Sequence, residues 1–135
     1  MKRSGFKSRS KPLAAKTPMR KVSRKKAARR QSKEGQSGLR YMRAVKQLGC
    51  CVCGMPPPSD AHHCISGRYG TRKASDFETI PLCRNCHQDG PNAIHRAKAS
   101  WEAIHGPDTG HIKPTRRLVA MLDPAALDEV DHDAS

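Results

Sequence analysis

The chain has 135 residues, enough for one domain with tails, and a formal net charge of +14. Residues 1–40 hold fifteen Lys or Arg and one acidic residue, whereas the remainder holds eleven of each sign, so the first forty residues carry the whole excess. The N-terminus has no apolar core of a secretory signal, and no window approaches the roughly 20 apolar residues of a membrane span, so we expect a cytoplasmic protein. The charge indicates a polyanionic partner, either nucleic acid or an acidic membrane surface, of which we expect DNA rather than a membrane.

Residues 1–38 are rich in Lys, Arg, Ser, Pro and Gly, with only scattered apolar side chains. Such a segment cannot bury enough apolar surface to offset its ordering entropy, so we expect a disordered basic arm that binds DNA. Within it, "SRKKAARRQSK" (23–33) could become helical on an anionic surface. A solvated tail that only improves solubility is the alternative. The predicted DNA contacts, with two from a later loop, are Arg24, Lys25, Lys26, Arg29, Arg30, Arg72 and Lys73.

The predicted domain covers residues 39–122. Apolar residues at three- and four-residue spacing indicate an amphipathic helix over 39–48, ended by Gly49. After a proline-rich loop, "AHHCISG" (61–67) and "FETIPLC" (77–83) read as the two strands of an antiparallel pair.

Helices are predicted for the rest of the chain. The segment 91–106 has Pro91 in its first turn and an apolar face of Ile94, Ala97, Trp101 and Ile104. "TRRLVAML" (115–122) is a further helix. Residues 123–135 form a short acidic helix or tail, with Asp123 as its N-cap.

Six cysteines in a chain without an export signal favour metal binding over disulfides. Cys50 and Cys53, and Cys83 and Cys86, form two Cys-x2-Cys pairs, each able to present two thiolates to one zinc ion. We therefore predict a structural zinc that stabilises a body too small to depend on its apolar core. Cys51 could replace Cys50, Cys64 is expected to be a packed thiol, and a redox or disulfide role is the alternative.

The histidines next to the cysteine pairs have no role in the zinc site. His62 and His63 are adjacent and His87 directly follows Cys86, while His95 could face the same side two helical turns later. Because neighbouring residues on a strand point to opposite faces, we expect His62 and His63 to take different roles only at a bend. His111 is a weaker candidate ligand, and the remaining histidines are expected to be ordinary surface residues.

The segments that contain these cysteines and histidines resemble those of a known protein family. "CCVCG", "DAHHCISG" and "ASDFETIPLCRNCH" resemble the zinc-stapled HNH endonucleases. The resemblance implies a small α+β domain of ββα-metal type, with flanking helices. It implies that His62 and His87 bind a catalytic ion, that His63 is the general base, and that the middle position of the family pattern falls near Asp76, where an orienting Asn is commoner. His95 is a further candidate ligand.

A closer resemblance covers most of residues 40–112, through "AHH", "KASDFETIPLC", "HQDGPNAIH" and "AKASWEA". These segments look like the phage recombination-enhancement nucleases, whose disordered basic arm precedes a small HNH-type domain. The resemblance implies a phage- or prophage-encoded protein in the bacterial cytoplasm. It also implies cleavage directed by a RecA filament at the displacement loops the filament forms, which promotes recombination.

The expected activity is metal-dependent hydrolysis of a DNA phosphodiester bond. Mg²⁺ would need oxygen ligands from phosphate and water, because imidazoles alone favour Mn²⁺, Ni²⁺ or Zn²⁺. One ion and one base predict nicking by a monomer, without a helix that reads base sequence. Two alternatives stay open: a non-catalytic zinc module that binds nucleic acid, and an interaction protein whose basic arm bridges partners.

Overall fold

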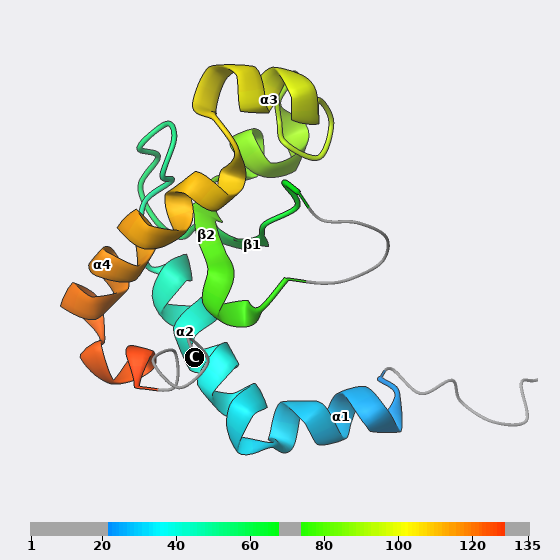
Figure 1. Cartoon of the computed structure of the whole chain (residues 1–135), viewed down its shortest axis with the longest axis vertical. Coiled ribbons are helices and arrows are strands. Elements are labelled where there is room, and N and C mark those ends of the chain that lie inside the picture. Colours follow the sequence, from blue (N-terminus) through cyan, green and yellow to red (C-terminus); the bar gives the residue numbers. More distant parts are fainter. Residues whose placement is uncertain (1–21, 68–73, 129–135) are drawn as a thin grey trace, which may run out of the picture.

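The computed structural model describes residues 22–67 and 74–128, which form a small α+β fold with a two-stranded antiparallel sheet (Figure 1). The helices and strands, in chain order, are α1 (Arg24–Gln31), α2 (Lys33–Lys46), β1 (Asp60–His63), β2 (Thr79–Leu82), α3 (Lys98–His105) and α4 (Ile112–Leu122). Short helical turns at Asp76–Glu78, Asn85–Asp89, Asp108–His111 and Pro124–Leu127 connect or extend them. No helix in the described part of the chain is long and apolar enough to cross a membrane.

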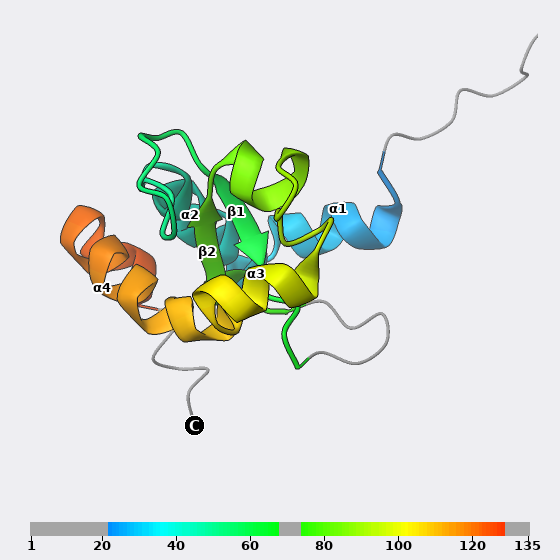
Figure 2. The same cartoon turned by 90° about the horizontal axis from the view of Figure 1, so that it is seen from above.

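The sheet confirms the predicted antiparallel pair. Asp60 pairs with Leu82 and His63 with Thr79, so the two histidines lie at the end of β1 beside the start of β2. All four residues of β2 are buried, because α2 and α4 both pack against this strand (Figure 2). The sheet thereby gives the histidines of β1 a rigid support.

Two apolar clusters fill the interior. The first joins α2 to α4 through Tyr41, Val45, Phe77 and Val119, with the Tyr41 and Phe77 rings 5.7 Å apart. The second packs around the cysteine pairs and is built on Ile80, Leu82, Ile94 and Trp101. The residues that surround the cysteines are therefore part of the core that holds the sheet.

The N-terminal region differs from the prediction. Residues 1–21 lie outside the described part of the chain, but residues 24–31 and 33–38 are helical rather than disordered, and α2 begins six residues before the predicted start at 39. Two serines explain the helices: the Ser23 side chain accepts a hydrogen bond from the backbone amide of Lys26, and Ser32 accepts one from that of Gly35.

The long helix predicted for 91–106 is wrong in its first half. Only Lys98–His105 is α-helical, and Ile104 is 60% exposed. Residues 90–97 instead fold back on the preceding turn, with the amides of Ile94 and His95 donating to the carbonyls of Cys86 and His87 at 3.0 and 3.2 Å. Burial of Ile94 in the second core outweighs its helical spacing.

The C-terminal elements also differ in detail. Helix α4 begins at Ile112, and the turn after it, Pro124–Leu127, has the predicted proline at its start. Asp123 does not cap this turn with its side chain; its carboxylate accepts two hydrogen bonds from the Arg40 guanidinium at 2.8 and 2.9 Å. Since Arg40 lies on α2, this pair ties the end of α4 to the first helix of the domain. Residues 129–135 lie outside the described chain.

Candidate metal sites and the His63–Asp76 pair

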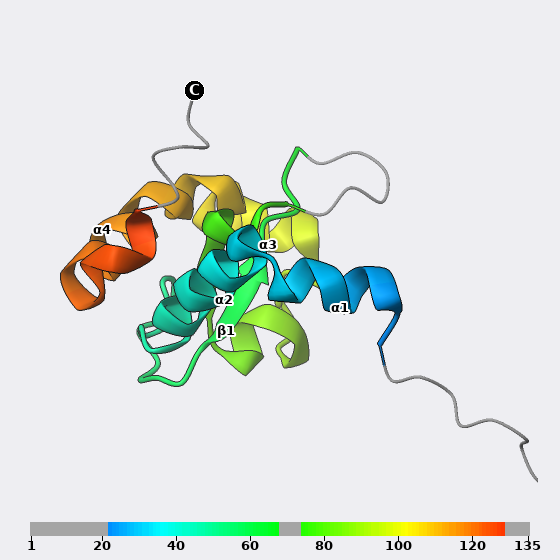
Figure 3. The same cartoon turned by 90° about the horizontal axis from the view of Figure 1, so that it is seen from below.

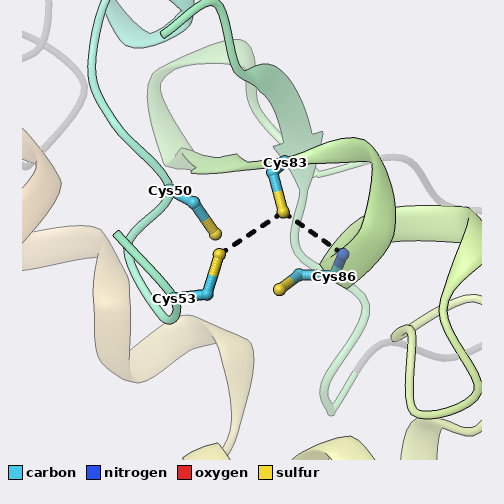
Figure 4. Close-up of side chains that lie close together, drawn as sticks. All are labelled: Cys50, Cys53, Cys83 and Cys86. Carbon is cyan, nitrogen blue, oxygen red and sulfur yellow. Dashed lines mark hydrogen bonds between the residues drawn. The ribbon is translucent and has the colours of Figure 1, made fainter. Parts of the chain in front are cut away.

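The two Cys-x2-Cys pairs come together at one end of the sheet (Figure 4). Cys50 and Cys53 lie in the loop after α2, while Cys83 directly follows β2 and Cys86 lies in the Asn85–Asp89 turn. One sulfur atom from each of the four residues lies within 4.8 Å of the others, and the Sγ atoms of Cys53 and Cys83 are 3.5 Å apart. The thiols converge on one point from two segments thirty residues apart.

This arrangement fits a tetrahedral zinc ion. Zinc–sulfur bonds of 2.3 Å place the sulfur atoms of a Cys₄ site about 3.8 Å apart, close to the observed contact and far beyond a disulfide bond. Burial opposes ionisation of Cys50, but hydrogen bonds from the backbones of Cys83, Cys53 and Val52 outweigh it and lower the pKa of this thiol to about 7. Burial, with the neighbouring thiols, raises the pKa of Cys86, so ionisation of the complete set needs the positive charge of a bound metal ion. The four cysteines could therefore hold a structural metal such as zinc.

The other two cysteines do not belong to this cluster. Cys51 is half-buried against the second core, and Cys64 is buried with its thiol 3.3 Å from the carbonyl oxygen of Glu78. Burial raises the pKa of each thiol to about 12, so both stay protonated. The choice left open between Cys50 and Cys51 is settled geometrically for Cys50, and Cys64 is the packed thiol that was expected.

Three histidines form a second cluster. His62, from β1, lies with its ring centroid 5.1 Å from each of the His87 and His95 rings, whose own centroids are 4.8 Å apart. The Nε2 atoms of His87 and His95 are separated by 3.1 Å, near the roughly 3.3 Å expected for two imidazole ligands of one tetrahedral zinc-like ion. The structure thus brings together all three predicted metal ligands, although His95 arrives by a turn rather than on a helix.

Carboxylates support two of these rings. Asp108 Oδ2 accepts from Nε2 of His62 at 3.0 Å, and Asp60 Oδ2 lies 2.9 Å from Nδ1 of His87. Asp108 is completely buried, and burial opposes its charge, but hydrogen bonds from His62, from the Ile65 amide and from Ser66 hold its pKa well below the usual range. A carboxylate on the second ring nitrogen is the usual support of a metal-bound histidine.

This donor set fits a divalent ion. Nε2 of His62 and Nδ1 of His87 are engaged by carboxylates, which leaves the other nitrogen of each ring, together with a nitrogen of His95, as donors that could hold an ion. Three imidazoles suit Zn²⁺, Mn²⁺, Ni²⁺ and similar ions better than Mg²⁺. His62 is buried whereas His95 is exposed, so one side of the cluster is open to a substrate.

His63 lies on the opposite face of β1 from His62 and has a different partner. Its Nε2 is 2.7 Å from Oδ1 of Asp76, which lies in the turn just before β2. The expected bend is absent, because both residues belong to the extended strand and ordinary alternation separates them. Gly38 of α2 gives Asp76 its space: a Cβ there would lie 2.7 Å from Asp76 Oδ2.

The remaining predicted residues are elsewhere. Arg24, Lys25, Lys26, Arg29 and Arg30 are exposed on α1, while Arg72 and Lys73 lie outside the described residues. His111 is not in the cluster: its Nε2 is 3.2 Å from the carbonyl oxygen of His105, and both rings pack on Trp101. Asp108 and Asp60 were missed. Asp60 stands two residues before His62 and could have been considered, but nothing local marks Asp108.

Comparison with known proteins assigns the chain to a family. No curated protein and no solved structure matches the chain. A family model described as "Protein of unknown function (DUF968)" matches residues 15–119, which include both metal clusters and the His63–Asp76 pair. The chain belongs to the DUF968 family.

Proposed function

We propose that this protein is an HNH-type DNA endonuclease that hydrolyses a phosphodiester bond at displacement loops formed by RecA. The observation that supports the proposal is that three histidines form a possible ion site while the fourth, His63, has a different position and partner. A complete Cys₄ cluster leaves His62, His87 and His95 together as a separate set of nitrogen ligands, and the adjacent His63 is paired with a carboxylate. A module that only binds nucleic acid needs neither of these two arrangements.

The three-histidine cluster is the proposed site of a catalytic divalent ion. Asp108 and Asp60 fix the rings of His62 and His87, so that their remaining nitrogens face one point. When bound, such an ion would stabilise negative charge on the scissile phosphate and on the leaving oxygen. The exposed side of the cluster, at His95, is where the phosphate enters.

His63 is the proposed general base. Its ring would take the proton of the attacking water, and the Asp76 carboxylate, 2.7 Å from Nε2, would stabilise the resulting imidazolium. Because His62 and His63 are consecutive residues that point to opposite faces at the end of β1, the phosphodiester group would have to lie across this strand end to reach both the ligand cluster and the base.

Substrate choice in this proposal comes from DNA structure and a partner. The basic residues of α1 supply contacts to phosphate that carry no sequence information. The likeness of the segments around the histidines to the phage recombination-enhancement nucleases supports RecA as the partner that presents the DNA. One ion and one base act on one strand at a time, so the product is a nick with 5′-phosphate and 3′-hydroxyl ends.

Strand cleavage of a plasmid that carries a RecA-formed displacement loop tests the proposal. Wild type, His63→Ala and the control His105→Ala are compared with and without RecA, with Mg²⁺ and then Mn²⁺. We expect wild type and the control to nick at the loop with RecA, and His63→Ala to bind without cutting. Cutting without RecA would remove the partner from the proposal. If no protein cuts with any ion, a zinc-stabilised binding module is the better account.

A further inference from the structure

Helices α1 and α2 meet at a sharp corner at Ser32, and hydrogen bonds hold this corner although α1 buries none of its own residues. The Ser32 hydroxyl donates to the carbonyl of Arg29 at 2.6 Å and accepts from the amide of Gly35 at 3.1 Å. Gly35 passes so close to α1 that a Cβ would lie 1.9 Å from the Arg29 carbonyl oxygen. The corner places α1 outside the body of the domain, on the side away from α4 (Figures 1 and 3).

Two adjoining hollows lie inside this corner and share Arg29, Gly35 and Asp76. One, of about 160 Å³, has Leu39 and Met42 on its α2 side and Lys26 and Arg30 on its α1 side. The other, of about 240 Å³, continues past Ala74, Ser75 and Phe77 and carries a second carboxylate, that of Glu34, beside Asp76, so the phosphates of a ligand would face the three cations and not this end of the groove. Together they form the corner groove, which runs from the basic face of α1 to the partner of His63.

The groove combines two properties. Leu39 and Met42 are half-buried and form an apolar wall, while Lys26, Arg29 and Arg30 are exposed. None of these three cations forms an ion pair within the described residues. An anionic ligand with an apolar part would satisfy both surfaces.

We propose that the corner groove binds an unpaired DNA strand, with a base against Leu39 and Met42 and the flanking phosphates on Lys26, Arg29 and Arg30. A duplex could use the cations but not the apolar wall, because its bases are stacked inside the helix. An unpaired strand exposes the face of each base, which apolar and cationic side chains can both contact. The apolar residues line a hollow rather than a flat surface, which disfavours a membrane as the ligand.

Asp76 connects the corner groove to His63, the proposed general base. The same carboxylate lines both hollows and lies 2.7 Å from Nε2 of His63, so a strand in the groove leads directly to the proposed base. This inference rests on the proposed function for its choice of DNA as the ligand. It adds that α1 and α2 select strands whose bases are accessible.

The test is binding of full-length, zinc-loaded protein to a fluorescent 20-nucleotide single strand and to the matching duplex, without added catalytic ion. Leu39→Asn removes the apolar wall, and the control Leu118→Asn makes the same change at a residue of α4 that is 47% exposed. We expect Leu39→Asn to weaken binding of the single strand about fivefold, as for a few tens of Å² of lost apolar contact, and of the duplex less than about twofold. Equal losses for the two probes, or no loss, would overturn the proposal.

Arg29→Gln provides a second variant at an exposed position, with Arg117→Gln of α4 as its control. Loss of one phosphate contact reduces the salt dependence of single-strand binding by about 0.7 in the slope of log K against log salt. If Arg29→Gln behaves like the control, the groove is not the binding site. Because no cleavage is measured, these results stand apart from the plasmid assay: a protein that does not cut can still show the groove, and a nuclease can lack it.

Discussion

The buried carboxylate of Asp108 accepts a hydrogen bond from Nε2 of His62 at 3.0 Å, across 46 residues of sequence. The same carboxylate accepts from the backbone amides of Ile65 at 2.7 Å and Ser66 at 3.1 Å, so it fixes both the ring and the chain that follows β1. This contact holds the His62 ring with its centroid 5.1 Å from those of His87 and His95. Asp108 is thus a positioning residue for the proposed ion.

Replacing Asp108 with Asn should weaken metal binding at the histidine cluster. Loss of such a support costs about 10–100-fold in metal affinity, because the ring loses its orientation and basicity. Titration of Mn²⁺ or Co²⁺ into zinc-loaded protein measures the effect, with the exposed Asp89→Asn as the control. Unchanged affinity in a folded Asp108→Asn protein would show that the cluster does not depend on this contact.

The two buried thiols Cys83 and Cys64 separate the role of zinc from that of packing. Both are almost fully buried, but only Cys83 belongs to the four-cysteine cluster. Cys83→Ser should abolish zinc retention and cooperative unfolding, since a structural zinc supplies about 10 kcal/mol or more to the fold of a small domain. Cys64→Ser should keep one equivalent of zinc. Elemental analysis and thermal unfolding of both variants measure this; zinc retained by Cys83→Ser would contradict the assignment.

The parts of the molecule that the sequence predicted well have local signals. The spacing of the cysteine pairs indicated a four-ligand site, and two short segments around His62 and Ile80, separated by a polar loop, indicated the two strands. The histidines were notable because the cysteines already completed one site. Each of these inferences depends on residues close together in the sequence and on chemistry that few other residue types can supply.

The parts that were missed depend on long-range contacts. Asp108 reaches His62 from a distant loop, and Asp123 pairs with Arg40 rather than capping its own turn. The start of α3 was misplaced because burial of Ile94 and the return of the chain to the Asn85–Asp89 turn compete with helical spacing. Helix α1 was expected only on an anionic surface and the start of α2 was missed, because their charge indicated disorder, whereas serine caps and the corner at Gly35 define both helices.

Gly38 should control the geometry of the His63–Asp76 pair. In a helix interior, Gly→Ala ordinarily stabilises by about 1 kcal/mol. Here the added Cβ would lie 2.7 Å from Oδ2 and 3.0 Å from Cβ of Asp76, so the carboxylate has to move away from His63. A displacement of that kind should lower kcat of the proposed cleavage about tenfold or more, with KM little changed. Gly110→Ala, which meets no atom within 4 Å, is the control; equal rates in both variants would contradict the role of Asp76.

Tyr41 should make the fold sensitive to alkaline pH. Its side chain is fully buried in the first core, and its hydroxyl has no hydrogen-bond partner among the described residues. Burial raises its pKa above the ordinary value of 10, against a weaker opposing effect of the nearby Arg116. Above pH 10 the unfolded chain therefore releases this proton while the folded chain keeps it, so stability falls as the pH rises.

Replacing Tyr41 with Phe removes both the ionisable group and the unpaired hydroxyl. A buried polar group without a partner costs about 1–3 kcal/mol, so we expect Tyr41→Phe to be at least as stable as wild type at pH 7. The difference should grow in favour of the variant above pH 10, where only wild type loses stability through this side chain. Urea unfolding of both proteins at pH 7, 9 and 10.5 measures it. A variant that is less stable at pH 7, by an amount that stays constant with pH, would show that the hydroxyl is bonded in the folded protein.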